Sequence, residues 1–449
     1  MGGGRARPAD QRLPGLGRSA RPVDAARSCA ALIATEPLST LSAVLVALAL
    51  VIVVSKLLGR LLARFDQPAV IGEILGGIVL GPSLLGVLAP QLQQAVFSAA
   101  VLPQLNLLSQ LGLILFMFLV GLEVNPEHLH GRMQLAARIS LAGIVLPLLL
   151  GVLLAVGLES VLPGLLPGDR TLPGLLFMGT AMAITAFPVL SRLLKERGLL
   201  GQPLGQLVIS CAAIDDVVSW VLLAAVVSFT RSGSVLGALP ALIGTLAWAL
   251  LLLLGLKPLM HRLEEHYRRE RQLSPILLSV LFAGAILSAV ITDWIGVHYI
   301  FGAFLFGLAL PRYGPLLRRL RLHIEDLVLT LLLPVFFAIS GLNTRIADLD
   351  QPLLWLALLA VLAVAIGGKF IGCWAMARLG GLPPQQAQAV GWLMNTRGLT
   401  ELVILNVALS LGVISTTLFT MMVVMALVTT AMASPLLTRL GISPAASPG

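Results

Sequence analysis

The sequence predicts an all-α protein that crosses a membrane about thirteen times, and three observations lead to this fold class. Of the 449 residues, 57% are hydrophobic and 11% are charged, whereas soluble domains carry about 25% charged residues. Apolar runs of about 20 residues, long enough to cross a hydrocarbon layer roughly 30 Å thick, recur along the chain. Basic residues gather in alternate loops between these runs. A soluble core could not absorb this much apolar surface.

The apolar runs define the predicted spans, of which the ninth is short. They lie at about 38–58, 69–88, 105–123, 136–158, 172–194, 204–229, 234–257, 274–293, 298–311, 325–342, 352–377, 386–410 and 414–438. Together they predict one membrane domain over residues 38–438. Residues 1–37 are rich in Gly, Pro and Arg without apolar periodicity, so we expect a disordered tail.

The loop charges predict how the chain is oriented. With the N-terminus outside, nearly all Lys and Arg residues that flank the spans face the cytoplasm, and only Arg170, Arg231 and Arg345 face out. The Arg-rich tail is the one segment that disagrees. Residues 439–449 then form a short cytoplasmic tail, in which we expect no nucleotide-binding domain. The net charge of +9 is explained by membrane topology, so we expect no nucleic-acid partner, and lipid surrounds the spans.

Two predicted spans contain residues that a continuous apolar helix avoids. The fifth reads GTAMAITAFP over residues 179–188, with Thr185 just before the helix-breaking Pro188. The twelfth contains MNTRGLTE over residues 394–401. These spans are seven apart, so they cross the membrane in opposite directions. Paired interruptions of this kind predict inverted repeats with two broken helices and a binding site near mid-membrane.

Five charged residues lie deep in the predicted spans. Each costs roughly 3 kcal/mol at the bilayer centre, on the order of 15 kcal/mol together if unpaired, so something must compensate them. They are Asp215 and Asp216 in the sixth span, Lys369 in the eleventh, and Arg397 and Glu401 in the twelfth. Neighbouring helix positions point about 100° apart, so one aspartate can pair with Lys369 while the other stays free to bind an ion.

The free carboxylate suits exchange of a cation for a proton. A hard monovalent cation prefers oxygen ligands, and a carboxylate in a partly dehydrated cavity holds its proton more tightly than one in water. Proton and cation then compete for one group, with Thr185 as a further oxygen ligand. A structural role stays open for Asp215 and Lys369, because a buried acid and base can neutralise the dipole ends of crossed helices.

Three further expectations concern neighbouring residues. Arg397 and Glu401 are four residues apart, which allows an intrahelical ion pair, and Glu73 is an alternative partner for Arg397. Gly367 and Gly368 precede Lys369 and remove side-chain bulk, which lets that helix approach another closely. The three cysteines show neither a disulfide framework nor metal-ligand spacing, and we expect no cofactor.

At these residues the chain resembles the monovalent cation:proton antiporter-2 family, relatives of Kef-type potassium efflux proteins, plant cation/proton exchangers and bacterial sodium/proton antiporters. The matching stretches are 67–86 (QPAVIGEILGGIVLGPSLLG), 113–124 (LILFMFLVGLEV), 180–196, 213–219 (AIDDVVS), 336–343 and 394–406 (MNTRGLTELVILN). The resemblance implies a sodium/proton antiporter fold in the bacterial inner membrane. The chain lacks the C-terminal nucleotide-binding domain of the Kef pattern, so nucleotide gating is not expected.

The resemblance also implies an assembly and residue roles. It implies a homodimer in which a core of about 136–229 and 352–438 moves against dimerisation spans of about 38–123 and 274–342, with 234–257 as a linker helix. Asp216 would match the carrier of proton and cation, and Asp215 the partner of Lys369. The transported ions would be H⁺ and Na⁺ or K⁺.

Two other functions remain as alternatives. One is a potassium efflux system or channel of the same fold, which a saturable, proton-coupled flux would exclude. The other is an intramembrane aspartyl protease, which needs two acids facing each other across a gap. Asp215 and Asp216 are neighbours on one predicted helix, which argues against a protease. We therefore expect a transporter and not an enzyme.

Overall fold

The computed structural model describes residues 39–65, 67–123, 133–167, 171–255, 274–311 and 314–442, and parts of 259–268. The predicted disordered tail, residues 1–37, and most of the C-terminal tail lie outside these residues. The described part is all-helical, as expected, and contains no strand. Nine of its helices are long and apolar enough to cross a membrane, and shorter apolar helices accompany them.

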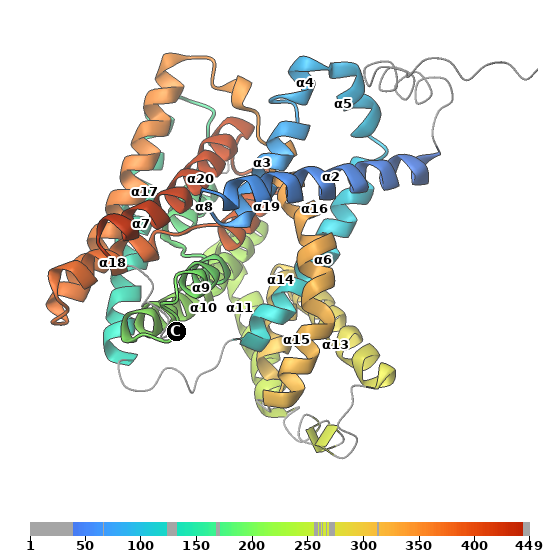
Figure 1. The fold of residues 1–449 in the computed structure, drawn as a ribbon, viewed down its shortest axis with the longest axis vertical. Helices are drawn as coiled ribbons and strands as arrows, with labels where there is room; N and C mark the ends of the chain where they lie inside the picture. The colour runs from blue at the N-terminus through green and yellow to red at the C-terminus, as the bar shows by residue number, and fades with distance from the viewer. Residues whose placement is uncertain are drawn as a thin grey trace, which may run out of the picture.

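The helices follow one another along the chain (Figure 1). Their bounds are α2 Thr40–Ala63, α3 Ala69–Leu80, α4 Leu85–Leu88, α5 Pro90–Val96, α6 Leu102–Glu123, α7 Met133–Val161, α8 Thr171–Ala183, α9 Phe187–Glu196, α10 Pro203–Ser232, α11 Val235–Leu250, α13 Pro275–Ile295, α14 Tyr299–Ala309, α15 Gly314–Leu327, α16 Leu333–Leu342, α17 Pro352–Leu379, α18 Pro384–Met394, α19 Leu399–Ser410 and α20 Thr416–Arg439.

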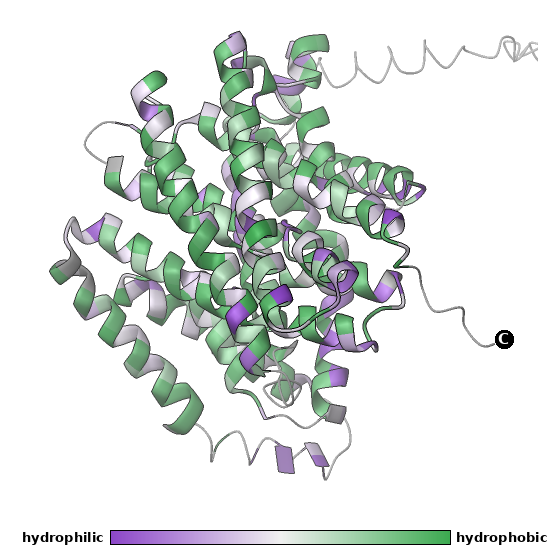
Figure 2. Ribbon diagram, turned by 90° about the vertical axis from the view of Figure 1, so that its left-hand side faces the viewer, coloured by the Kyte–Doolittle hydropathy of each residue, from purple (hydrophilic) through white to green (hydrophobic). Residues whose placement is uncertain are grey.

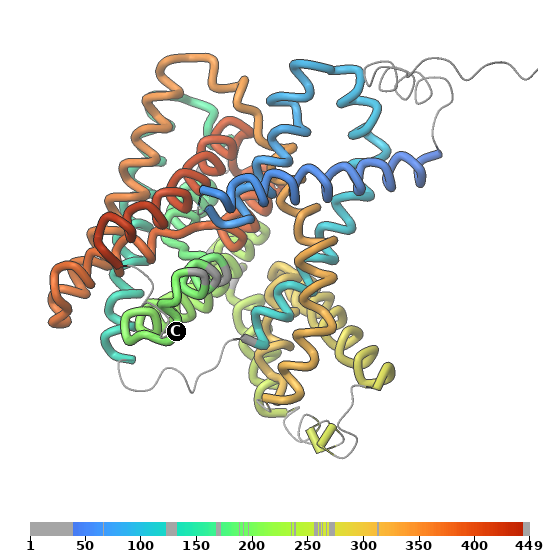
Figure 3. Tube along the Cα trace, viewed as in Figure 1, coloured from blue at the N-terminus to red at the C-terminus, as the bar shows by residue number. Residues whose placement is uncertain are grey.

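The helices pack in two groups. Helices α7–α10 and α17–α20 contact one another and form what we term the crossing group, because it contains both broken spans. Helices α2–α6 and α13–α16 form the flanking group, and α11 contacts both α10 and α13. Segments distant in sequence thus lie together: Figure 3 shows α2 and α3, near the start of the trace, beside α16. The groups also meet where α16 contacts α19 and α3 contacts α20.

The outer surface of the helices is apolar. Figure 2 shows hydrophobic residues along most of each helix, with hydrophilic residues gathered mainly near the helix ends. In α2, only 22% of an apolar 18-residue stretch is buried inside the protein. Leu41, Leu45, Val53 and Leu57 of this helix are exposed. Exposed apolar surface of this extent is stable when lipid or another apolar surface covers it.

The tenth span begins earlier than the sequence predicted. Its helix starts with α15 at Gly314 and not near residue 325, and a π-helical turn over Val328–Leu332 joins α15 to α16. The prediction failed because Arg318, Arg319 and Arg321 lower the hydropathy of this stretch. The structure accommodates them because only one face of α15 is buried, through Leu316, Leu320 and Ile324, which recur every four residues.

Glycines let several helices approach closely, but one of the two expected beside Lys369 does not. A Cβ atom on Gly368 would lie 3.2 Å from Cα of Pro147 in α7, so the expectation for Gly368 is confirmed. A Cβ atom on Gly367 would meet nothing within 4 Å, so that expectation was wrong. One close approach within the flanking group joins α3 and α16, where a Cβ atom on Gly77 would lie 2.7 Å from Cα of Ala338.

This approach gives a stability prediction. We expect Gly77→Ala to lower the midpoint of thermal unfolding in detergent, because the added methyl group forces α3 and α16 apart at a cost of about 1–3 kcal/mol. Gly367→Ala adds the same methyl group into open space and should leave the midpoint unchanged. Equal midpoints for Gly77→Ala and the unchanged protein would show that this contact does not hold the flanking group together.

Candidate functional site

Both spans that the sequence predicts as broken are interrupted in the structure. Helix α8 ends at Ala183 and α9 begins at Phe187, while α18 ends at Met394 and α19 begins at Leu399. Pro188 lacks the N–H that would continue the first helix, which explains one break. The two breaks touch, because the N–H of Ala186 donates to the carbonyl of Thr396 at 3.0 Å. The extended segments therefore cross inside the crossing group.

Two buried cations cap the carbonyl end of α8 at this crossing. The guanidinium of Arg397 donates to the carbonyls of Ala181 and Met182, each at 2.8 Å. The Lys369 ammonium donates to the carbonyl of Ala183 at 2.5 Å. The last carbonyls of a helix lack intrahelical partners and carry the negative end of the helix dipole. Arg397 and Lys369 therefore neutralise the negative end of the α8 dipole, in addition to any carboxylate that they pair with.

Asp215 is surrounded by donors. Its Oδ2 accepts from the Lys369 ammonium at 2.7 Å and from the Thr185 hydroxyl at 2.8 Å, and its Oδ1 accepts from the Ser140 hydroxyl of α7. All four residues are buried. Thr185 also contacts the carbonyl of Met394 at 2.7 Å, which ties both breaks to this carboxylate. The structure thus places Thr185 against Asp215, and Ser140 is a partner that sequence reasoning missed.

Asp216, the next residue along α10, is equally buried but far less engaged. Its side chain is 1% exposed. Its Oδ1 is contacted by the Thr400 hydroxyl at 3.4 Å, and the backbone N–H of Phe187, at the start of α9, lies close to it. Among the described residues, no Lys or Arg forms an ion pair with it. Thr400 is another contact that the sequence did not indicate.

Arg397 and Glu401 form the ion pair that their spacing allows, but the pair is not intrahelical, because Arg397 lies in the second break and Glu401 in the first turn of α19. Nη1 of Arg397 lies 3.5 Å from Oε2 of Glu401, and both side chains are fully buried. Neither carboxylate oxygen of Glu401 has a hydrogen-bond partner in the part of the chain that the structure describes. Glu73, the alternative partner for Arg397, forms an ion pair with Lys56 of α2 at 3.1 Å. Charge compensation in the twelfth span is therefore local.

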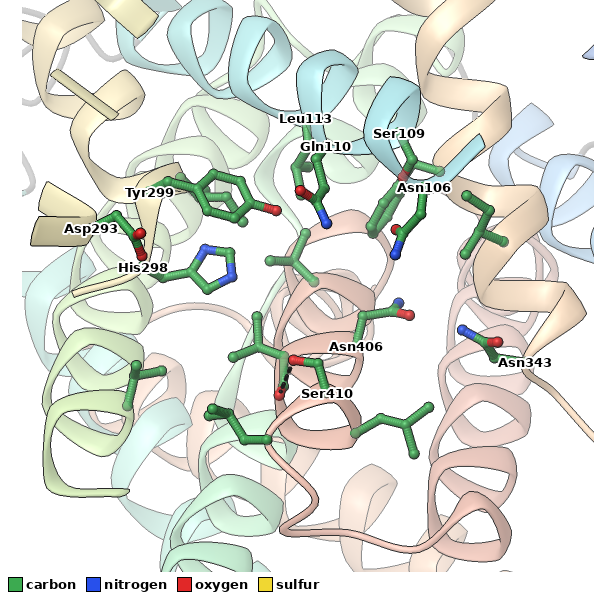
Figure 4. Close-up of a pocket in the computed structure, with 18 of the residues that line it drawn as sticks. Asn106, Ser109, Gln110, Leu113, Asp293, His298, Tyr299, Asn343, Asn406 and Ser410 are labelled. Atoms are coloured by element: carbon green, nitrogen blue, oxygen red, sulfur yellow. Dashed lines mark hydrogen bonds between the residues drawn. The ribbon is translucent and has the colours of Figure 1, made fainter. Parts of the chain in front are cut away.

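A polar cavity of about 490 Å³ lies between the two helix groups, and we term it the vestibule (Figure 4). From the flanking group, Gln110, His298, Tyr299 and Asn343 point into it, and Asn406 of α19 lies between them. Phe336 and Val403 are among the residues that line the vestibule, and Asp216 is not. Val403 is three residues beyond Thr400, the contact of Asp216, so the vestibule approaches the buried carboxylate without reaching it.

Two polar contacts at the vestibule bridge the helix groups. The guanidinium of Arg231, in α10, lies 3.4 Å from the carboxylate of Asp293, in α13. The amide of Asn406, in α19, donates to the hydroxyl of Ser340, in α16, at 2.8 Å. Both contacts join a helix of the crossing group to one of the flanking group. A movement of one group against the other would have to break them.

Comparison with known proteins defines the class to which this chain belongs. Residues 43–441 match the family described as sodium/hydrogen exchanger, transmembrane, and the chain belongs to it. It is therefore a cation/proton antiporter, a transporter and not an enzyme.

Individual relatives cover most of the chain. It is 45% identical to the Na⁺/H⁺ antiporter NhaS4 of Synechocystis over 91% of this chain and 99% of that protein. It is 38% identical to cation/H⁺ antiporter 17 of Arabidopsis thaliana over 86% of this chain, but spans only 47% of that longer relative. The solved structure of the sodium proton antiporter MjNhaP1 from Methanocaldococcus jannaschii superposes with a TM-score of 0.63. The superposition covers 90% of this chain and 98% of that one at 14% identity, which shows a shared fold.

Proposed function

We propose that this antiporter uses Asp216 as the group that is alternately protonated and bound to a monovalent cation. One observation carries the proposal: two adjacent buried carboxylates have opposite surroundings. Asp215 accepts from Lys369, Thr185 and Ser140, whereas the contact of Thr400 with Asp216 is long, at 3.4 Å. A buried carboxylate without a cationic partner is stable only when a proton or another cation neutralises it. Asp216 is therefore the carboxylate left free for exchange.

The same surroundings define the roles that we propose for the other site residues. Lys369 balances the charge of Asp215, so the charge of the site depends on Asp216 alone. Thr185 holds Asp215 and the second break together. We also propose that the Thr185 hydroxyl oxygen and a carboxylate oxygen of Asp215 are ligands of the cation. Arg397 and Glu401 compensate each other and the end of α8. The cation is Na⁺ or K⁺, and the name of the Synechocystis relative, a Na⁺/H⁺ antiporter, supports Na⁺.

We further propose that the crossing group moves against the flanking group during transport. The groups correspond to the expected core, at about 136–229 and 352–438, and dimerisation spans, at about 38–123 and 274–342. The expected linker, at about 234–257, includes α11, which contacts both groups. Support comes from the vestibule, since a cavity at the border of two helix groups changes shape when they slide. Asp216 is buried here, so the site would be occluded.

Assembly and orientation complete the proposal. We propose a homodimer in the bacterial inner membrane, with the C-terminus in the cytoplasm. The exposed apolar face of α2 supports a place for lipid or a second copy, and the loop charges support the orientation. In this orientation the Arg231 end of the vestibule faces outside.

Reconstitution tests the proposed function. The purified protein in liposomes that contain a pH-sensitive dye should move protons when Na⁺, K⁺ or Li⁺ is added outside, and empty liposomes should not. The cation that gives the largest saturable response identifies the substrate. Cation flux without any linked proton movement would instead support the potassium channel alternative.

The proposed orientation gives a second test. Ser410 is exposed and lines the vestibule, so we expect a membrane-impermeant thiol reagent to block Ser410→Cys in right-side-out vesicles. Attachment there fills the cavity between the helix groups. The background variant Cys29→Ser keeps only Cys211 and Cys373, which are buried, and should be insensitive. Inhibition that requires the reagent on the inner side would contradict the orientation.

A further inference from the structure

Polar atoms without partners concentrate at the second break. In the described part of the chain, nine buried side-chain nitrogen and oxygen atoms have no hydrogen-bond partner, and five of them belong to residues 395–401. Asn395 contributes both Oδ1 and Nδ2, although its side chain is 1% exposed. Buried amides are nearly always hydrogen-bonded, because burial without a partner is unfavourable. A partner of Asn395 must therefore lie outside the described residues.

The neighbours of Asn395 place it at the crossing. The carbonyl of Met394, one residue before it, accepts from the Thr185 hydroxyl, which also contacts Asp215. The carbonyl of Thr396, one residue after it, accepts from the N–H of Ala186, which precedes Phe187, whose backbone N–H lies close to Asp216. The backbone of Asn395 is thus fixed between the segments that hold the two carboxylates. Figure 1 shows α8 and α19, which flank these breaks and contact each other.

Most other oxygen groups at the breaks already have a hydrogen-bond or charge partner. The Thr396 hydroxyl donates to the carbonyl of Leu393 at 2.8 Å. The carbonyls of Ala181, Met182 and Ala183 accept from Arg397 and Lys369. The Glu401 carboxylate has no hydrogen-bond partner among the described residues, but Arg397 balances its charge at 3.5 Å. The amide oxygen of Asn395 is therefore a ligand-type atom at the crossing that lacks a partner within the described chain.

We propose that Asn395 provides its amide oxygen to the transported cation at Asp216, an inference that rests on the proposed function. A hard cation that has lost its water needs several oxygen ligands. Asp216 provides carboxylate oxygens, and an amide provides a neutral one. A neutral ligand adds affinity without a second negative charge, so one proton can still replace the cation. Asn395 is then a residue that sets cation affinity and selectivity from the second broken helix.

Cation dependence of two properties tests this proposal. We expect Asn395→Ala to raise the half-saturating Na⁺ concentration in proteoliposomes by roughly tenfold or more, the usual loss when a metal site loses one supporting group. The maximal rate should change less. Na⁺ should also raise the thermal unfolding midpoint of the unchanged protein in detergent relative to choline, and this increase should shrink in Asn395→Ala. Asn395→Ser keeps a side-chain oxygen, so its half-saturating Na⁺ concentration and its stabilisation by Na⁺ should lie between those of Asn395→Ala and the unchanged protein. This variant replaces Asn395→Ala in the test if Asn395→Ala does not fold.

The alternatives give different results. If a buried water satisfies Asn395, the variants shift the unfolding midpoint equally in Na⁺ and choline and leave half-saturation unchanged, which would overturn the proposal. Ser55→Ala is the matched control, because it removes another buried unpartnered polar atom, on α2 in the flanking group. It should leave both cation responses intact. Failure of the proposed function gives a different result from failure of this proposal. In that case Asp216→Asn would still exchange cations for protons at the normal rate, independently of the result for the Asn395 variants.

Discussion

Proteoliposomes that contain Asp216→Asn are expected to show no proton movement when Na⁺, K⁺ or Li⁺ is added. The amide cannot release or accept the proton that exchange requires, and it provides no charge to neutralise a bound cation. The protein should still fold, because Asp216 forms no ion pair among the described residues and asparagine has nearly the same shape. Dye-reported proton flux and the thermal unfolding midpoint together measure this result.

A matched control distinguishes the effect of losing the carboxylate at position 216 from a general effect of an Asp-to-Asn substitution. Asp350→Asn makes the same change at an exposed aspartate in the connection between α16 and α17, and should exchange as the unchanged protein does. Undiminished flux in Asp216→Asn would contradict the assignment of the carrier. A variant that loses flux and also fails to fold would be followed by Asp216→Glu, which keeps the carboxylate and should retain some exchange.

Lys369→Met is expected to produce the largest loss of stability, about 3–5 kcal/mol, because it leaves the Asp215 carboxylate buried without its cation. It also leaves the carbonyl of Ala183 at the end of α8 without its donor. The thermal unfolding midpoint in detergent measures this loss.

The double variant Asp215→Asn with Lys369→Met tests whether the instability of Lys369→Met comes from the unpaired charge of Asp215. Removing both charges leaves no buried unpaired ion, so most of the lost stability should return. Equal instability of the single and double variants would contradict the pairing as the cause. If the double variant folds, its remaining exchange shows whether Asp215 serves only to orient the site.

The sequence predicted the helix interruptions because their causes are local. Pro188 and the polar run around Asn395 disfavour a continuous apolar helix whatever surrounds them. The opposite surroundings of Asp215 and Asp216 could also be anticipated, since neighbouring helix positions point in different directions and Lys369 provides one deep base.

Other parts of the site could not be predicted from the sequence. Ser140 and Thr400 contact the two carboxylates across long stretches of chain, and a single Ser or Thr in a transmembrane helix is too common to carry a signal. The vestibule depends on how α6, α14, α16 and α19 pack, which no local pattern encodes. The long tenth helix was missed for a different reason, because hydropathy averages over the buried and exposed faces of α15.

The dependence of half-saturation on pH tests the exchange at Asp216 most directly. If H⁺ and the metal ion occupy one carboxylate in turn, the Na⁺ concentration that gives half-maximal exchange must rise as the pH falls, and enough Na⁺ must restore the maximal rate. A half-saturating concentration that stays constant across pH would mean that the two ions bind at separate groups, and Asp216 would then not be the exchange site.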